Sequence, residues 1–172
     1  HFPIDNIYVI NREVIVVVEY EDEDGAHPFA KWFEALNVQA ALKVRTAIAR
    51  MENSNFSNVK PPRDTGQFAK PEKGRGRAMA LTREFKETIK LRARSDPEFR
   101  VGLLTEAAEC LLNDEVDVAK TLLRDYVNAT LGFQELASLT DKKPASLMRM
   151  LSSKGNPSLY NISNIIVLYY II

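Results

Sequence analysis

The first apolar residues of the chain follow an extended pattern rather than a helical one. The stretch IYVINREVIVVVEY (residues 7–20) is dense in valine, isoleucine and tyrosine, and the polar residues 11–13 divide it into two apolar runs. This pattern predicts a β-hairpin or two edge strands. Because an isolated hairpin is only marginally stable in water, we expect these strands to pair with another copy or to pack under helices.

Helical spacing begins after the acidic turn EDEDGA at residues 21–26. Pro28 stands where the first turn of a helix accepts proline, and apolar residues then recur every three or four positions. The periodicity predicts two helices, at about 28–36 and 38–52. The aromatic residues of the first one are expected in a hydrophobic core rather than in a ligand cage.

The segment from residue 53 to residue 78 lacks apolar periodicity and contains several prolines and glycines. This composition predicts a linker at 61–78, between a first unit at 1–60 and a second at 79–172. Residues 60–77 carry six basic side chains against two acidic ones. Two interpretations stay open for them: a solvated tether, or a contact with phosphate or with an acidic partner.

The elements expected after the linker are all helices. Three of them occupy residues 79–130, with start signals at Thr82, at Asp96-Pro97 and at Asn113-Asp114. Two short helices follow within 133–158, and a further helix begins at about Ser158. The whole pattern predicts the α+β class, in which an N-terminal β-hairpin and two helices precede an all-α domain.

Composition excludes several classes of function. Charged residues make up 27% of the chain and balance to zero, so any nucleic-acid binding must come from local patches. No run approaches the roughly 18 consecutive apolar residues that a membrane span needs, and the single cysteine, Cys110, indicates a buried thiol. We therefore expect a cytoplasmic protein without a membrane contact.

The chain carries no recognisable catalytic or metal-binding pattern. Its two histidines, His1 and His27, are distant from each other and from Cys110, which makes a metal site unexpected. Acidic residues are plentiful on the expected helices, but none is accompanied by a histidine, a serine or a glycine-rich segment that would indicate hydrolysis. We expect no cofactor and no enzymatic activity.

The two short helices carry the main indication of function. Their inward positions are expected to be Phe133, Leu136 and Ala137 in the first and Leu147, Met150 and Leu151 in the second. The small Ala137 allows a close helix crossing, and Asp141 stands where the turn requires an unusual backbone angle. Spacing alone leaves two interpretations open, a DNA-binding helix-turn-helix or a packed corner of a helical domain.

The stretch GFQELASLTDKKPASLMRMLSSKGNPSLYNISNII (132–166) resembles the helix-turn-helix of the phage-repressor and Cro superfamily. From Met79 to about Ile166 the chain is similar to HigA-like addiction-module antitoxins. The resemblance implies a lambda-repressor-like helix-turn-helix in a repressor that binds operator DNA, with a RelE/HigB-type toxin as a further partner. The apolar end, LYNISNIIVLYYII, departs from the polar end that is usual in the family.

The preceding half has a resemblance of its own. EYEDEDGAHPFAKWFEALNVQAALKVRTAIARMENSNFSNVKPP (19–62) resembles the opening of HigB/RelE-type toxins, whose complete members are ribosome-dependent mRNA endonucleases. The later strands of that family, which carry its basic catalytic residues, should follow Lys60-Pro61, but the chain enters the predicted linker instead. The resemblance thus implies a truncated toxin remnant, without catalytic residues, fused to an antitoxin.

The docking geometry of the superfamily assigns roles to the second short helix, which enters the major groove. It implies that Pro144, Ala145 and Arg149 face bases, and that Arg149 donates two hydrogen bonds to a guanine. Contacts with phosphate or the groove edge are implied for Lys142, Lys143, Ser146 and Lys154. We expect a homodimer on paired half-sites. The alternative function is a protein-interaction module that binds or titrates a toxin without binding DNA.

Overall fold

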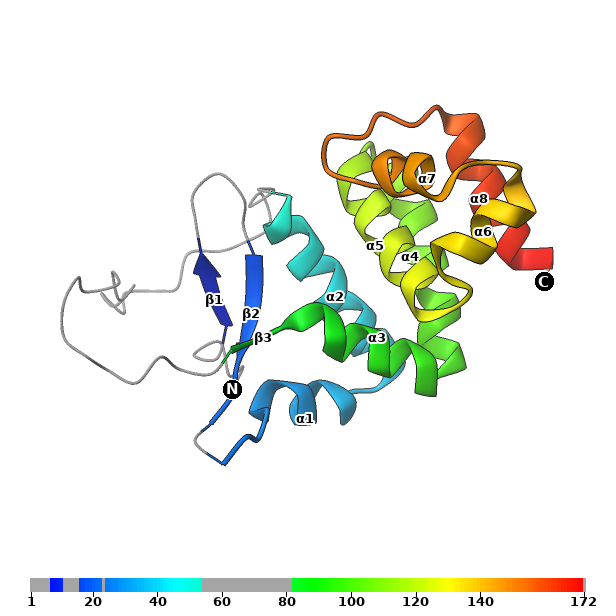
Figure 1. The fold of residues 1–172 in the computed structure, drawn as a ribbon. Coiled ribbons are helices and arrows are strands. Elements are labelled where there is room, and N and C mark those ends of the chain that lie inside the picture. Colours follow the sequence, from blue (N-terminus) through cyan, green and yellow to red (C-terminus); the bar gives the residue numbers. More distant parts are fainter. Residues whose placement is uncertain (1–6, 11–15, 23, 54–81, 172) are drawn as a thin grey trace.

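The computed structural model describes residues 7–10, 16–22, 24–53 and 82–171. Eight helices and three strands lie in these ranges (Figure 1). The strands are three to five residues long, whereas the longest helices have 14 to 16 residues. The described part is therefore predominantly helical, and the expected α+β class is wrong. Strand-forming sequence is confined to a few short runs, and helical periodicity governs the remainder.

The strands β1 (Ile7–Ile10), β2 (Val16–Tyr20) and β3 (Thr82–Glu84) pair in the order β1-β2-β3, with both pairs antiparallel. Thr82 lies opposite Tyr20, and the next helix begins only at Phe85. The expected helix cap at Thr82 is therefore wrong. The pairing of β2 with β3 joins residues from either side of the predicted linker, so the local pattern around Thr82 does not disclose it.

Helices α1 (Pro28–Glu34) and α2 (Val38–Glu52) lie close to their expected bounds. Asn37 caps α2, because its side chain accepts a hydrogen bond from the backbone N–H of Ala40 at 2.9 Å. Phe33 is fully buried, and its ring meets those of Phe85 and Phe99 edge-on at centroid distances of 5.7 and 5.8 Å. The aromatic stripe of α1 thus belongs to the core, as expected.

Helices α3 (Phe85–Ser95), α4 (Pro97–Leu112) and α5 (Val116–Ala129) form the centre of the molecule (Figure 1). The start signal of α4 is confirmed, because the Asp96 side chain accepts from the N–H of Phe99 at 3.0 Å. The expected start at Asn113-Asp114 is wrong. Asp114 has a left-handed backbone with φ of 63°, and its N–H donates to the carbonyl of Leu111, so these residues close α4 instead of opening α5.

Helices α6 (Gly132–Thr140), α7 (Pro144–Met150) and α8 (Leu159–Ile171) lie at the end of the molecule away from the sheet (Figure 1). One hydrophobic core runs through the described residues, from Val17 in β2 to Ile165 in α8. It joins segments from both sides of the predicted linker, and the division into two domains stays a prediction. The linker itself, 61–78, is outside the described residues. Within the described ranges, no helix combines the length and apolar character that crossing a membrane requires.

Candidate nucleic-acid interface

A short turn sets the relation between α6 and α7. Asp141 ends α6 with a left-handed backbone, φ 51° and ψ 39°, which is the unusual angle expected of this position. The N–H of Lys142 then donates to the carbonyl of Ala137 at 3.2 Å, which satisfies one of the last carbonyls of α6. Lys143 is extended and Pro144 occupies the first helical position, so the chain re-enters a helix within three residues.

The inward face of the helix pair is apolar. Five of the six positions expected to face inward are buried, and Met150 is partly buried against the same core. These buried positions are Phe133, Leu136, Ala137, Leu147 and Leu151. Below them α6 rests on α5, where the guanidinium carbon of Arg124 lies 5.7 Å from the centroid of the Phe133 ring. The short helix α7 is thus held through one face only.

The outward face of α7 is exposed and carries small side chains, one arginine and one methionine. Ala145, Ser146 and Arg149 are exposed, and Met148 is 39% exposed between them. The guanidinium of Arg149 makes no hydrogen bond or ion pair with another described residue. This face can therefore approach a second molecule closely while offering a charged group with five N–H donors.

The other residues assigned to DNA contacts lie around α7. Lys143 and Lys154 are exposed, whereas Lys142 and Pro144 are half-buried. Between residues 132 and 160 the sequence has four basic and two acidic side chains, which is a local charge of +2. The structure brings the seven assigned residues to the turn, to α7 and to the loop after it. Their role in binding DNA stays a prediction.

The loop after α7 is held in place by Lys120 on α5 and by the close approach at Gly155, and the sequence singled out neither residue. The Nζ atom of Lys120, on α5, donates to the carbonyl of Gly155 at 2.6 Å and lies 2.6 Å from a carboxylate oxygen of Asp117. A Cβ atom on Gly155 would lie 2.3 Å from the carbonyl oxygens of Arg149 and Met150. Only glycine fits this approach. The sequence Lys-Gly-Asn-Pro indicated a stop there, but nothing local pointed to a buried lysine on α5.

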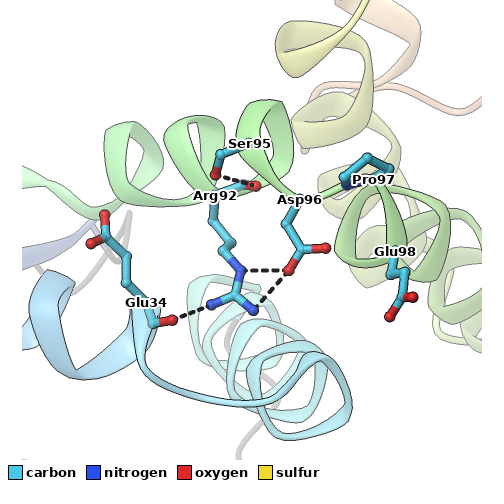
Figure 2. Close-up of a pocket in the computed structure, with 6 residues that line it drawn as sticks. All are labelled: Glu34, Arg92, Ser95, Asp96, Pro97 and Glu98. Atoms are coloured by element: carbon cyan, nitrogen blue, oxygen red, sulfur yellow. Dashed lines mark hydrogen bonds and ion pairs between the residues drawn. The ribbon is translucent and has the colours of Figure 1, made fainter.

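A surface hollow beside α1 is lined by a structural hydrogen-bond cluster rather than by a ligand site. Its lining includes Arg92, which donates to the carbonyls of Phe33, Glu34 and Leu36 at 3.2, 2.7 and 3.0 Å. Figure 2 shows the same guanidinium bonded to the carboxylate of Asp96, at 2.9 Å from Nε. All three nitrogens of Arg92 are engaged in closing the end of α1, so they offer nothing to a ligand.

Cys110 is 2% exposed on α4, the buried thiol that the sequence predicted. Burial raises its pKa to about 12, which keeps it protonated at neutral pH. In the ranges that the structure covers, no three histidine, cysteine or acidic side chains group together in a way that could hold a metal ion.

Comparison with known proteins adds no further assignment. No protein-family model matches the chain, and neither the curated proteins nor the solved structures yield a match. The function is therefore inferred from the residues and from their geometry.

Proposed function

We propose that this protein is a DNA-binding transcriptional regulator of the toxin–antitoxin type, which places α7 in the major groove of operator DNA. One observation carries the proposal: Arg149 stands on the exposed face of α7, and its guanidinium makes no hydrogen bond or ion pair with another described residue. Arginine in this setting can donate two parallel hydrogen bonds to the O6 and N7 atoms of guanine. The buried opposite face of α7 supplies the rigid support that such recognition needs.

The residues around Arg149 suit both kinds of contact that DNA binding combines, contacts with phosphates and contacts with base edges. Lys143 and Lys154 are exposed near the two ends of α7 and carry charges that phosphates attract. Ala145 and Ser146 are small, so the backbone of the first turn can come close to the base edges. Pro144 contributes shape, and Lys142 stands at the edge of the groove.

Two copies are needed for useful affinity. A local charge of +2 neutralises few phosphates, whereas a symmetric dimer doubles the contacts on half-sites about one helical turn apart. Helix α8 exposes Leu159, Tyr160 and Val167, which are 74%, 70% and 53% accessible. We assign this apolar face to the contact between copies, because large exposed apolar side chains that lie together are typical of interaction surfaces.

Titration of labelled duplex DNA at several salt concentrations tests the proposal. We expect saturable binding, and the logarithm of the association constant should fall linearly with the logarithm of the salt concentration. Lys143→Ala should reduce that slope by about one unit for each bound copy. The matched control is Lys31→Ala on α1, which removes the same charge from an exposed site at the other end of the molecule (Figure 1). Absence of binding at low salt would refute the proposal, and so would equal slopes for the two variants.

A further inference from the structure

A second interaction surface lies on α4 and α5, where α2 docks. Among the described residues, four side-chain hydrogen-bonded pairs join α2 and its C-cap residue to α4, to α5 and to the residue before α5. In each pair the residue of α2 or its C-cap supplies the donor and the other side supplies the acceptor. Arg45 donates to Asp125 at 2.6 Å, Arg50 to Glu115 at 2.8 Å, Thr46 to Glu106 at 3.0 Å and Asn53 to Thr121 at 3.0 Å. Two of these pairs join a cation before the predicted linker to a carboxylate after it, and Arg45 also donates to Glu52 of α2 itself at 3.1 Å.

The centre of this contact is closely fitted. Leu42 of α2 is buried against Gly102 of α4, and a Cβ atom on Gly102 would lie only 2.3 Å from Cδ1 of Leu42. Beside it, the side chains of Arg45 and Asp125 are 1% and 8% exposed. A notch that receives one side chain, next to a desolvated charge pair, is the arrangement by which protein interfaces select a partner.

We propose that this face of α4 and α5, defined by Gly102, Glu106, Glu115 and Asp125, is a protein-docking surface whose occupant is residues 28–53 of the same chain. Because residues 28–53 occupy this docking surface, a separate chain with helices similar to α1 and α2 cannot bind there. Because the surface is already filled, the protein does not titrate a toxin-type partner at this site. The docking surface is distinct from α7, so its test is independent of DNA binding.

The test begins with a protease site placed within residues 61–78 of the full chain, so that the two segments can be separated after folding. We expect the cut segments to elute together and to dissociate only on dilution. In the cut protein, Arg45→Ala should raise the dissociation constant of the segments about 100-fold to 1,000-fold, because it leaves the Asp125 carboxylate buried and unpaired. Segments that separate at micromolar concentration without any substitution would overturn the proposal.

Further variants separate loss of docking from loss of folding. Arg45→Met combined with Asp125→Leu and Glu52→Gln removes all three charges of this cluster, and we expect it to restore association to within about tenfold of the unsubstituted protein. Arg50→Ala removes a partly exposed pair, whose side chains are 28% and 17% accessible, and should raise the dissociation constant by no more than about tenfold. The control is Lys43→Ala, an exposed position on the same helix. Equal dissociation constants for Arg45→Ala and Lys43→Ala would contradict the proposal.

Exclusion of a separate partner is tested by exchange. A cut preparation with a tag on its first segment is diluted below the measured dissociation constant, mixed with untagged protein and concentrated again. When the untagged protein has also been cut, the tag should retrieve its second segment. When the untagged protein is left uncut, the tag should not retrieve it. Retrieval of uncut protein to the same extent would show that the docking surface is open in the intact chain. Failure to retrieve the second segment of cut protein would show that the docking surface does not accept residues 28–53 of another chain. Either result would contradict the proposal.

Discussion

Two buried charges, Arg45 and Asp125, show how strongly single residues constrain this molecule. Burial by itself would lower the pKa of Arg45, but the carboxylates of Asp125 and Glu52 outweigh it and raise that pKa above its ordinary value. Burial also raises the pKa of Asp125, against the attraction of Arg45. Each charge is therefore tolerated only because its partner is present, which makes loss of one partner more damaging than replacement of both.

At the same scale, the thiol of Cys110 should be unreactive in the native protein. Its burial and its pKa of about 12 leave almost no thiolate at neutral pH, and the thiolate is the reactive form. We expect a disulfide exchange reagent to label Cys110 only as fast as the protein unfolds, and immediately in strong denaturant. Rapid labelling under native conditions would contradict the burial of this thiol.

At the scale of elements, helix ends were predictable where the signal is local. Pro28, Asn37 and Asp96 mark helix starts through steric preference and side-chain capping, and each acts within a few residues. The strand at Thr82 and the true start of α5 were missed, because one depends on pairing with β2 and the other on the left-handed turn at Asp114.

The cap at Asp96 predicts a specific pH dependence. Burial opposes its ionisation, but hydrogen bonds from the Phe99 N–H and from Arg92 lower its pKa below the ordinary value. A lowered pKa adds stability that is fully present above the ordinary pKa of about 3.9 and is lost as the pH falls through the lower folded value. Asp96→Ala should cost about 1 to 2 kcal/mol at neutral pH.

The comparison variant for this cap is Asp96→Asn, which keeps the backbone hydrogen bond but has no charge to titrate. In urea unfolding at a series of pH values, its deficit relative to the unsubstituted protein should shrink as the pH falls below about 4. A deficit that stays constant between pH 7 and pH 3 would show that the ionised carboxylate contributes nothing.

The loop after α7 gives a second prediction for an element. In Gly155→Ala the new methyl group would meet two backbone carbonyl oxygens, so the end of α7 must shift. We expect a loss of about 1 to 3 kcal/mol in unfolding free energy, together with weaker binding to every duplex. Ser153→Ala, at an exposed position of the same loop, should stay within about 0.5 kcal/mol. An unchanged melting temperature for Gly155→Ala would contradict this account.

The candidate site was predictable in part, because its signal, like that of the helix ends, is local in the sequence. Helical periodicity identified Leu136, Ala137 and Leu147 as inward positions, and their burial follows from it. The contact of Lys120 with Gly155 was not predictable, because a lysine on an amphipathic helix normally faces water. Its burial results from the packing of α5 beneath the loop after α7.

At the scale of the whole molecule, the two segments on either side of the predicted linker share a hydrophobic core but have different roles. The segment before it fills the acceptor-bearing face of α4 and α5, and the segment after it presents α7 at the other end of the molecule (Figure 1). The shared core was not evident from the sequence, because each contact between α2 and α5 joins residues that are far apart along the chain. The arrangement leaves α7 as the exposed face on which the proposed function depends.

The central claim is that the outward face of α7 recognises base pairs. The most direct measurement is selection of duplexes from a random library, followed by titration of the enriched duplex and a scrambled one with the unsubstituted protein and with Arg149→Ala. We predict enrichment of a defined sequence, and a loss of about 1 to 3 kcal/mol of preference for it in Arg149→Ala, with scrambled DNA bound almost equally by both. Failure to enrich any sequence, or an unchanged preference in Arg149→Ala, would contradict the claim.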